Sequence, residues 1–524
     1  MGSVGESGRP ENRAEVSRRR RPTVARTMKG PNHTRLVGQL PTETTESTTV
    51  VPAVFTRLVW VLWLLSTGLL AARLTTGGPW DVAGVFVVDG LTLLMWVVVT
   101  FFSGIVHSYS RRYMAGSRDL TRFFTRVFAF TLAVMVLVAA DHVVVFAAAW
   151  LAMGLVMADL IGYARDWPQA QAAATVARRY FLASTGLLVV AVAVLWNTTG
   201  AVTVSGLATA VDGGASTTVL VAAVALVLAA MVQSALLPFH TWLLSSMTAP
   251  TPASALMHAG FVNAGGILLV RFGPVVTVDP TLLLLVVVVG AASALGGKLA
   301  KSVQSDVKRQ LGCSTVGQMG FMIMQVGLGF FGAAITHLIL HGFYKAYLFL
   351  SSGEQVSRTA PTASRSGSET PGLVGTAVVL STALVGGALF AVLTGKGTSL
   401  DSGVLLALLV VLMTLQAART VVGRTALPAT VRYGAVPLVF LPAIAVYAAV
   451  YTAVTRLLAD LAVVTAPLPL SVPVGVVVAA FVVTYVVAET GRYQHSQRLY
   501  VALLNATQPP KRTLLTKTEE YNEY

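Results

Sequence analysis

Residues 332–350 read Gly332-Ala-Ala-Ile-Thr-His337-Leu-Ile-Leu-His341-Gly-Phe-Tyr-Lys345-Ala-Tyr-Leu-Phe-Leu, a run of the length that crosses a bilayer as one helix. His337, His341 and Lys345 are spaced by four residues, so they lie on one face of that helix. A charge at mid-helix costs about 2.5–3.5 kcal/mol in a bilayer, so three such groups require a function or partners. The pattern favours a proton path, because imidazole titrates near neutrality. Polar contacts between packed helices are the alternative.

The composition of the chain indicates a membrane protein with many spans. Of 524 residues, 55% are hydrophobic and 11% are charged, whereas soluble domains carry about 25% charged residues. We expect an all-α polytopic fold with about 14 transmembrane helices, each of about 20 apolar residues. The apolar segments lie at 50–72, 84–106, 123–140, 143–163, 175–196, 216–238, 252–271, 280–297, 312–330, 332–352, 373–395, 402–418, 433–455 and 467–488.

The positive charge of the chain is concentrated in alternate loops. Lys and Arg number 37 against 22 Asp and Glu, which gives a net charge of +15. Loops with two or more Lys or Arg follow the second, fourth, eighth, tenth and twelfth predicted spans, as cytoplasmic loops do, and the loops on the opposite side carry few. We therefore expect both termini in the cytoplasm, a lipid bilayer around the spans, and no nucleic-acid partner.

The ends of the chain are polar and the middle is apolar. Residues 1–48 include the run Arg18–Arg21 and predict a disordered, basic cytoplasmic tail. Contact of this run with anionic lipid head groups is an alternative role. The transmembrane domain is expected over residues 49–490, and residues 491–524 are expected to form a second cytoplasmic tail.

A second polar region joins the sixth and seventh predicted spans. It reads Gln233-Ser234-Ala-Leu-Leu-Pro238-Phe-His240, and the following span carries His258 and Asn263. Proline removes a backbone donor and interrupts a helix, and broken helices at membrane depth often line a transport pathway. We expect a discontinuous helix and a polar axis here. A loop at the membrane surface is the alternative.

Two further ionisable residues lie near the ends of predicted spans. Asp159 is either inside the membrane or near a helix end, and Lys396 either reaches the surface or ends a proton path. The single cysteine, Cys313, excludes an intrachain disulfide and a Cys-rich metal site. The sequence has no phosphate loop, no zinc-protease motif and no nucleophile elbow. We expect an ion-conducting subunit without catalytic residues, metal or cofactor.

The polar segments resemble a known family. Residues 233–242, 249–259 and 304–320, the stripe from His337 to Lys345, and the strings at 88–92 and 106–110 are similar to the proton-pumping, antiporter-like subunits. This family includes the L, M and N subunits of respiratory complex I and the large subunits of Mrp sodium/proton antiporters. The resemblance covers about residues 84–420 and implies inverted repeats with discontinuous helices.

Two departures point to one branch of that family. The pumping subunits carry Glu at the position of Leu151 and Lys at the position of Gln233. The DabB-type (MpsA-type) subunits of bacterial inorganic-carbon accumulation complexes are similar in lacking this pair. The resemblance implies a cell-membrane subunit that conducts protons or another cation to energise a large DabA-type, carbonic-anhydrase-like partner, which holds the zinc. The residues expected on the path are His258, His337, His341, Lys345, Lys308, Asp159 and Lys396.

Two other functions stay open at this point. One is a proton-translocating subunit of respiratory complex I or of an Mrp-type antiporter. The other is a non-conducting membrane scaffold that only anchors a soluble enzyme, which the loss of the Glu and Lys pair at Leu151 and Gln233 favours. No residue distinguishes protons from sodium as the coupling ion.

Overall fold

The structure is a computed structural model that describes residues 47–211, 216–355, 372–422, 428–489, 496–510 and 513. The tail expected over residues 1–48 lies outside the described residues, except for its last two. The tail expected over residues 491–524 also lies mostly outside them. The described part of the second segment, residues 496–510, contains one helix.

Each of the fourteen predicted spans coincides with one or more helices, so the all-α polytopic fold is confirmed. Within the described residues, nine helices are long and apolar enough to cross a membrane, and three apolar helices are shorter. Helices α13 and α14 coincide with the remaining two predicted spans, 312–330 and 332–352. The helices of the first half are α1 (Ser47–Thr76), α2 (Gly90–Tyr113), α3 (Leu120–Ala139), α4 (Val143–Ile161), α5 (Pro168–Thr199), α6 (Val204–Thr209), α7 (Thr217–Gln233) and α8 (Thr241–Ser245).

The second half continues the same pattern. Its helices are η1 (Ser246–Thr248), α9 (Thr251–Ala259), η2 (Phe261–Asn263), α10 (Ala264–Arg271), α11 (Gly273–Val276), α12 (Pro280–Ser302), α13 (Val307–Gly327), α14 (Phe331–Leu350), η3 (Ser352–Gln355), α15 (Leu373–Thr394), α16 (Gly403–Val422), α17 (Ala429–Leu457), η4 (Leu458–Asp460), α18 (Val472–Glu489) and α19 (Gln497–Ala506). A short antiparallel hairpin, β1 (Trp80–Val82) with β2 (Phe86–Val88), links α1 to α2.

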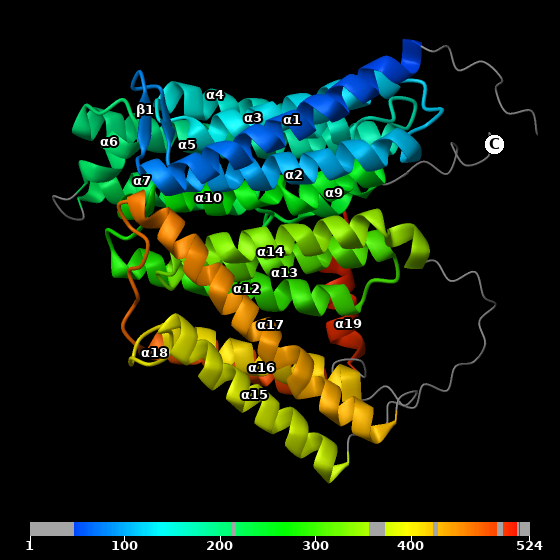
Figure 1. Ribbon diagram of the computed structural model, residues 1–524, viewed down its shortest axis with the longest axis vertical. Helices are drawn as coiled ribbons and strands as arrows, with labels where there is room; N and C mark the ends of the chain where they lie inside the picture. Colours follow the sequence, from blue (N-terminus) through cyan, green and yellow to red (C-terminus); the bar gives the residue numbers. More distant parts are fainter. Residues whose placement is uncertain are drawn as a thin grey trace, which may run out of the picture. The chain divides into compact units, whose positions relative to one another are not determined.

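The helices are arranged in layers along the sequence. Figure 1 shows α1 to α5 on one side of α9 and α10, with α13 and α14 on the other side. Helices α15, α16 and α18 lie beyond α12 and α13, and α17 crosses diagonally back towards α14. Helix α14 therefore lies between the two groups of helices, with one face buried and with Tyr344 and Tyr347 exposed on the other.

Helices α12 and α13 approach each other very closely because glycine faces glycine. A Cβ atom on Gly290 would lie 2.6 Å from the backbone nitrogen of Met324, and one on Gly320 would lie 2.5 Å from that of Ala294. Small residues at such contacts let helix backbones pack tightly in a membrane, where no hydrophobic force drives helices together. This pair of helices forms a rigid support beside α14.

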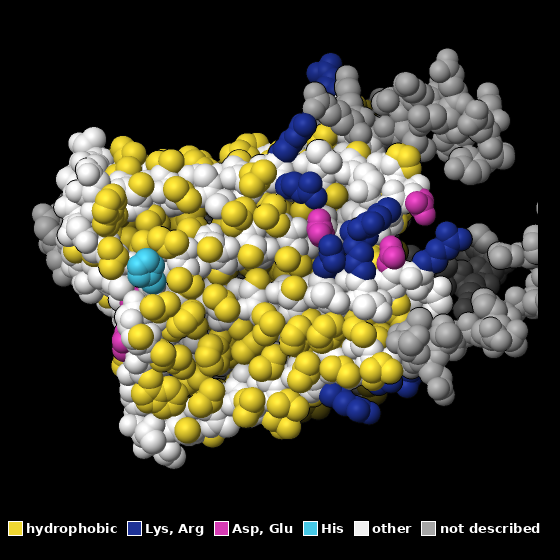
Figure 2. Space-filling view, turned by 90° about the horizontal axis from the view of Figure 1, so that it is seen from above, with side chains coloured by type: hydrophobic (Ala, Val, Ile, Leu, Met, Phe, Trp, Pro, Cys, Tyr) yellow, Lys and Arg dark blue, Asp and Glu magenta, His cyan; other side chains and the backbone are white. Residues whose placement is uncertain are grey.

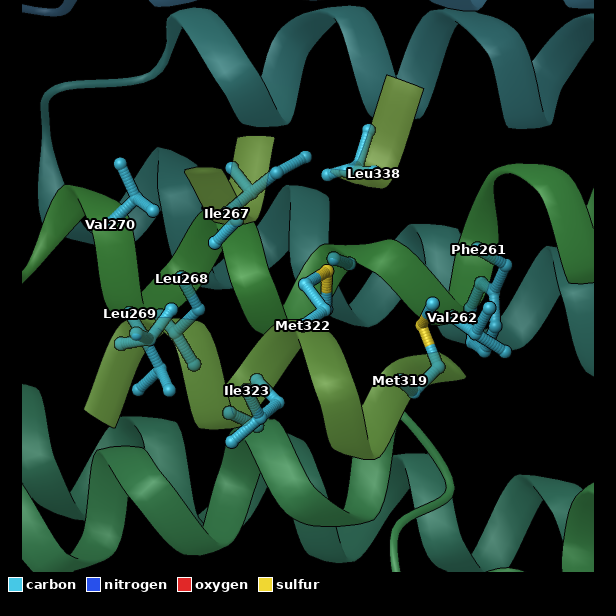
Figure 3. Packing of buried hydrophobic residues seen from close by; sticks show 14 of the residues in the cluster. Phe261, Val262, Ile267, Leu268, Leu269, Val270, Met319, Met322, Ile323 and Leu338 are labelled. Carbon is cyan, nitrogen blue, oxygen red and sulfur yellow. The ribbon is translucent and has the colours of Figure 1, made fainter. Parts of the chain in front are cut away.

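Apolar side chains fill the space between the interrupted helices and α13. Figure 3 shows Phe261 and Val262 beside Met319, and Ile267 and Leu268 beside Met322 and Ile323. All of these side chains are buried. Packing of this density fixes the position of each helix, because a change in side-chain volume of even one methylene group disturbs such a core. The buried polar groups described below are thus held in a close-packed apolar frame.

Two ion pairs tie the helix ends at the side of the protein opposite the basic loops. The Arg271 guanidinium binds both carboxylate oxygens of Asp89, and its Nη2 also donates to the Thr92 hydroxyl at 2.7 Å and to the Val138 carbonyl at 2.7 Å. Arg73 binds the Asp460 carboxylate, which also accepts the backbone N–H of Gly90 at 3.2 Å. These contacts join the first helices to η4 and α10.

We predict that Asp89→Asn destabilises the protein far more than removal of a surface ion pair does. The Asp89 and Arg271 side chains are only 5% and 10% exposed. Breaking a buried pair by removing one partner costs about 3–5 kcal/mol, because the other charge stays buried. The unfolding midpoint of the purified protein in detergent measures the loss.

Asp119→Asn is the matched control for this measurement. Asp119 is 51% exposed and lies 3.9 Å from Arg122, and an exposed pair of this kind contributes roughly 0–1 kcal/mol. Equal unfolding midpoints for the two variants would contradict the assignment of Asp89 as a structural anchor.

Candidate functional site

The ionisable stripe lies on α14 and faces the protein interior. Lys345 is 0% exposed and His341 is 5% exposed, whereas His337 lines a cavity. The imidazole rings of His337 and His341 lie 5.8 Å apart between centroids, at an interplanar angle of 30°. Neither ring nitrogen of His341 has a hydrogen-bond partner among the described residues. The helical spacing read from the sequence therefore does bring these three groups together.

A hydrogen-bonded network joins the stripe to two other helices. Lys345 Nζ donates to the Leu311 carbonyl of α13 at 2.8 Å. The Thr315 hydroxyl donates to the same carbonyl at 2.9 Å and lies 3.0 Å from Nδ1 of His258 on α9. Within the described residues, no carboxylate pairs with Lys345. Its amine is thus held by a backbone carbonyl and not by an acid.

The Thr315 contacts favour a proton on Nδ1 of His258. A hydroxyl has one hydrogen, and when Thr315 donates it to the Leu311 carbonyl, the Thr315 oxygen accepts from His258 Nδ1–H. His258 Nε2, which has no partner in the described part of the chain, then keeps its lone pair. The ring stacks on Phe349 at a centroid distance of 4.4 Å. A buried proton acceptor consequently lies close to Lys345.

The helix predicted over residues 216–238 is discontinuous. Helix α7 ends at Gln233, five residues before Pro238, and α8 begins only at Thr241. The freed backbone groups are satisfied within the protein: the Val232 carbonyl accepts from Trp242 Nε1 at 2.9 Å, and Ser293 Oγ accepts from the Leu237 N–H at 3.1 Å. Such internal partners are required where backbone leaves the helical conformation at membrane depth.

Gln233 and Ser234 lie at this break but make different contacts. The Ser234 hydroxyl donates to the Val262 carbonyl at 2.7 Å. The Gln233 side chain is 1% exposed, and neither its amide oxygen nor its nitrogen has a partner among the described residues. An amide buried in this way is costly. Gln233 is therefore a polar group placed on the axis without an internal partner.

A second interruption divides the span predicted over residues 252–271. Helix α9 ends at Ala259, and a 3-10 turn precedes α10 at Ala264. The Asn263 amide donates to the Ala259 carbonyl at 2.7 Å, while its oxygen has no partner within the described residues. Gly265 must be glycine, because a Cβ there would lie 2.6 Å from the Ala230 carbonyl. The two interruptions consequently pack directly against each other.

Lys396 lies at the far end of the stripe. It lies two residues after the end of α15, and its Nζ lies 4.2 Å from the centre of the ring of Phe330, the residue that precedes α14. An ammonium over an aromatic face is attracted by the ring quadrupole. Lys396 thus sits where α14 begins, two helical turns from His337.

The other end of the polar region lies near the basic loops. Lys308 Nζ donates to the Ala249 carbonyl at 3.1 Å, so it caps the short helices after the α7 break. His240 Nε2 lies 2.8 Å from the Ala506 carbonyl at the end of α19. Gln304 Nε2 donates to the Thr507 hydroxyl at 2.8 Å. The C-terminal helix α19 therefore covers this end of the break, a contact that the sequence did not suggest.

The structure does not bring Asp159 to the stripe. Its carboxylate is 36% exposed and accepts from Arg126 Nε at 3.1 Å and Arg178 Nη2 at 3.3 Å. Figure 2 shows Lys and Arg side chains gathered over this end of the helices, with acidic side chains among them. An exposed carboxylate between two arginines is typical of a surface ion-pair cluster.

Leu151 belongs to α4 and His107 to α2. Leu151 lines an apolar groove of about 590 Å³ between α4 and α5. His107 of α2 is fully buried, bonds to Ser103 at 3.2 Å, and has no partner for Nε2 among the described residues. Sequence reasoning did not single out His107 as a site, although it lies in one of the strings that carry the resemblance. The described residues contain no cluster of three or more metal ligands.

These helices and buried groups define the class of protein: a multi-pass membrane protein of the antiporter-like type. The family described as "NADH:quinone oxidoreductase/Mrp antiporter, TM" matches residues 140–422, and "NADH-Ubiquinone oxidoreductase (complex I), chain 5 N-terminus" matches residues 75–124. The chain belongs to this NADH:quinone oxidoreductase/Mrp antiporter family.

Curated relatives fall into two groups. The chain is 39% identical over 280 residues to a probable inorganic carbon transporter subunit, DabB1, of Halothiobacillus neapolitanus, over 52% of this chain and 50% of that protein. It is 40% identical over 287 residues to the DabB subunit of Bacillus subtilis, over 54% and 55%. It is also 36% identical over 272 residues to NADH-quinone oxidoreductase subunit L of Mycobacterium tuberculosis, over 51% and 42%. The chain thus spans about half the length of these relatives.

Solved structures show the same fold. A chain of the Mrp complex from Dietzia sp. DQ12-45-1b has a TM-score of 0.54 and 24% identity, over 88% of this chain and 51% of that one. A chain of the membrane-bound sulfane sulfur reductase, an archaeal respiratory membrane complex, has a TM-score of 0.53 and 16% identity, over 89% and 96%. At these identities the likeness concerns the fold alone.

We predict that loss of the side-chain contacts to α19 exposes it to protease. In the variant His240→Leu with Gln304→Leu, the bonds to Ala506 and Thr507 are absent, so local opening of α19 becomes easier. Trypsin should cleave after Arg498 of α19 several times faster than in the wild type. Mass spectrometry of the fragments measures this rate.

Ser302→Ala, which removes only a hydroxyl bonded within α12, is the control. An unchanged cleavage rate in the double variant would show that α19 is held by other contacts.

Proposed function

We propose that this chain is the membrane subunit of an inorganic-carbon accumulation complex and that it conducts protons to energise a partner. The partner is a carbonic-anhydrase-like protein of the DabA type, which holds the zinc and hydrates carbon dioxide. The family membership and the two DabB relatives support the proposal. The protein then acts in the cell membrane of a bacterium, with both ends in the cytoplasm.

The buried row of titratable groups carries this proposal. Lys345, His341 and His337 lie in register on α14, and His258 lies beside Lys345 through Thr315. Burying such groups among apolar helices costs free energy, so their presence indicates a function. A proton that leaves Lys345 can be accepted by a lone pair of His341 and passed to His337. Rings 5.8 Å apart are within reach of one bridging water.

A lysine lies near each end of the row of titratable groups. Lys308 and the Leu311 carbonyl lie at the end near the basic loops, and Lys396 lies over Phe330 at the start of α14. The proposed path runs from the first end through His258, Lys345, His341 and His337 to Lys396. Gln233 and Asn263, with polar atoms that lack partners among the described residues, are the groups that water on this path would hydrate.

A respiratory or Mrp-type ion translocator is the second candidate. It is favoured by the similarity to subunit L of Mycobacterium tuberculosis. Against it, Leu151 lines an apolar groove and Gln233 is an uncharged amide, so the carboxylate and lysine pair of the pumping subunits is missing. A charge relay that needs this pair cannot operate here, whereas conduction along α14 does not depend on it.

We predict that Lys345→Met and His341→Asn abolish proton flux. Each substitution removes one titratable group but keeps a side chain of similar size, so at least a tenfold loss of flux is expected while the complex still assembles. A pH-sensitive dye inside liposomes that contain the purified complex measures the flux under an imposed gradient.

Tyr344→Phe is the matched control, because Tyr344 is the neighbour of Lys345 on α14 but is 53% exposed. Its flux should equal that of the wild type. If Lys345→Met and His341→Asn also conduct like the wild type, the chain is an anchor and not a conduit.

We further predict that the purified complex contains one large partner with a zinc site. Affinity purification from a bacterium that expresses the tagged chain, followed by protein identification, distinguishes the two candidates. One carbonic-anhydrase-like partner supports the carbon-accumulation complex, and a set of many respiratory or Mrp subunits contradicts it. Loss of Lys345 should also abolish growth in air but not growth at high carbon dioxide.

A further inference from the structure

The seam between α12–α14 and α15–α18 contains two adjoining cavities. Each has a volume of about 250 Å³, and Phe321, Leu409 and Met413 line both. Figure 1 shows the helices that form this seam, with α12 and α13 on one side and α16 and α18 on the other. The two cavities therefore lie next to each other along α13, and among the residues of the proposed proton path His337 lines the second of them.

The first cavity is basic and polar at its mouth. Lys298 and Lys301 of α12 line it, together with Gln416 of α16 and Tyr485 of α18. These residues lie towards the ends of their helices that face the predicted cytoplasmic loops. Lys298 Nζ donates to Gln416 Oε1 at 2.7 Å, so the mouth is spanned by a link between α12 and α16. A basic pocket between transmembrane helices at the cytoplasmic side is the type of site that binds anionic lipid head groups.

The second cavity is apolar and lies deeper. Phe390, Leu406, Val410, Phe440 and Ile444 line it, and His337 and Tyr447 are its ionisable lining residues. Along α13 the lining runs from Ser314 to Gln325, a rise of about 16 Å at 1.5 Å per residue. This length is close to half of the roughly 30 Å hydrocarbon core, the depth that one acyl chain of one leaflet occupies.

We propose that this seam binds one anionic phospholipid. Lys298 and Lys301 hold its phosphate at the mouth, and one of its acyl chains extends between Phe321 and Met413 into the apolar cavity. The polarity changes from basic to apolar along the same direction as in a lipid molecule. Lysine side chains at helix ends reach the head-group level through their apolar stems, which suits this position.

The position of the lipid gives it a structural role. The acyl chain fills the space between α13 and the helices α16 and α17, where the two groups of helices would otherwise lack contact atoms. Its tip ends beside His337, so it covers that end of the stripe with hydrocarbon. This assignment is independent of the coupling ion and of the partner.

The test measures lipid retained by the purified chain. Wild-type protein is washed in mild detergent, titrated with phosphatidylglycerol or phosphatidylcholine of equal chain length, and analysed by native mass spectrometry. We expect one phosphatidylglycerol per chain and much weaker binding of phosphatidylcholine. Lys298→Gln with Lys301→Gln should weaken phosphatidylglycerol binding about 30-fold, from a roughly fivefold effect per lysine near an anionic surface. Arg309→Gln, which removes a basic residue that lines neither cavity, should bind like the wild type.

A second variant tests the acyl chain and guards against a general charge effect. Ala443→Phe places a ring in the apolar cavity and should lower binding without any change of charge. Equal affinity for the two lipids, equal losses in Arg309→Gln and the double lysine variant, or retention of a free fatty acid in place of a phospholipid would each overturn the proposal.

Discussion

The Leu311 carbonyl is the contact on which the arrangement of the polar centre depends. It accepts the amine of Lys345 and the hydroxyl of Thr315 at once, so it holds α14 and His258 of α9 to α13. In water, these groups would exchange partners freely. In an apolar bundle, each must find its partner within the protein, so the three helices can move apart only by leaving a lysine and a histidine unsatisfied. The hydrogen bonds that place the polar groups of the site therefore also hold α9, α13 and α14 together.

The sequence predicts the helices well because burial in a bilayer imposes a length and a composition on each span. The stripe from His337 to Lys345 follows from helical periodicity alone, and the break near Pro238 follows from the chemistry of proline. What could not be predicted depends on contacts between distant segments. Thr315 has no local signal that marks it as the partner of His258. Asp159 reads as an isolated acid in an apolar span, and only the fold places Arg126 and Arg178 beside it.

The sequence predicts that the helix is interrupted, but it does not predict the residue at which the interruption begins. Proline 238 signals a break, but α7 ends five residues earlier at Gln233. The reason is the close approach of Gly265 to Ala230 and Ser234, which brings α10 against the end of α7. The Ser234 N–H still donates to the Ala230 carbonyl and its hydroxyl donates to the Val262 carbonyl, while the helical conformation ends at Ala235, whose φ is +54°. Tertiary packing thus sets the boundary that local propensity only suggests.

The two ends of the stripe experience different surroundings, and this difference bears on how a cation would move along it. Lys345 is locked by a backbone carbonyl and fully buried, while His337 borders a cavity and the Phe321 ring at 5.2 Å. A group with a fixed partner changes charge only when that partner is released, whereas a group beside open space can be hydrated or covered by hydrocarbon. Control of access is consequently expected at His337 and not at Lys345.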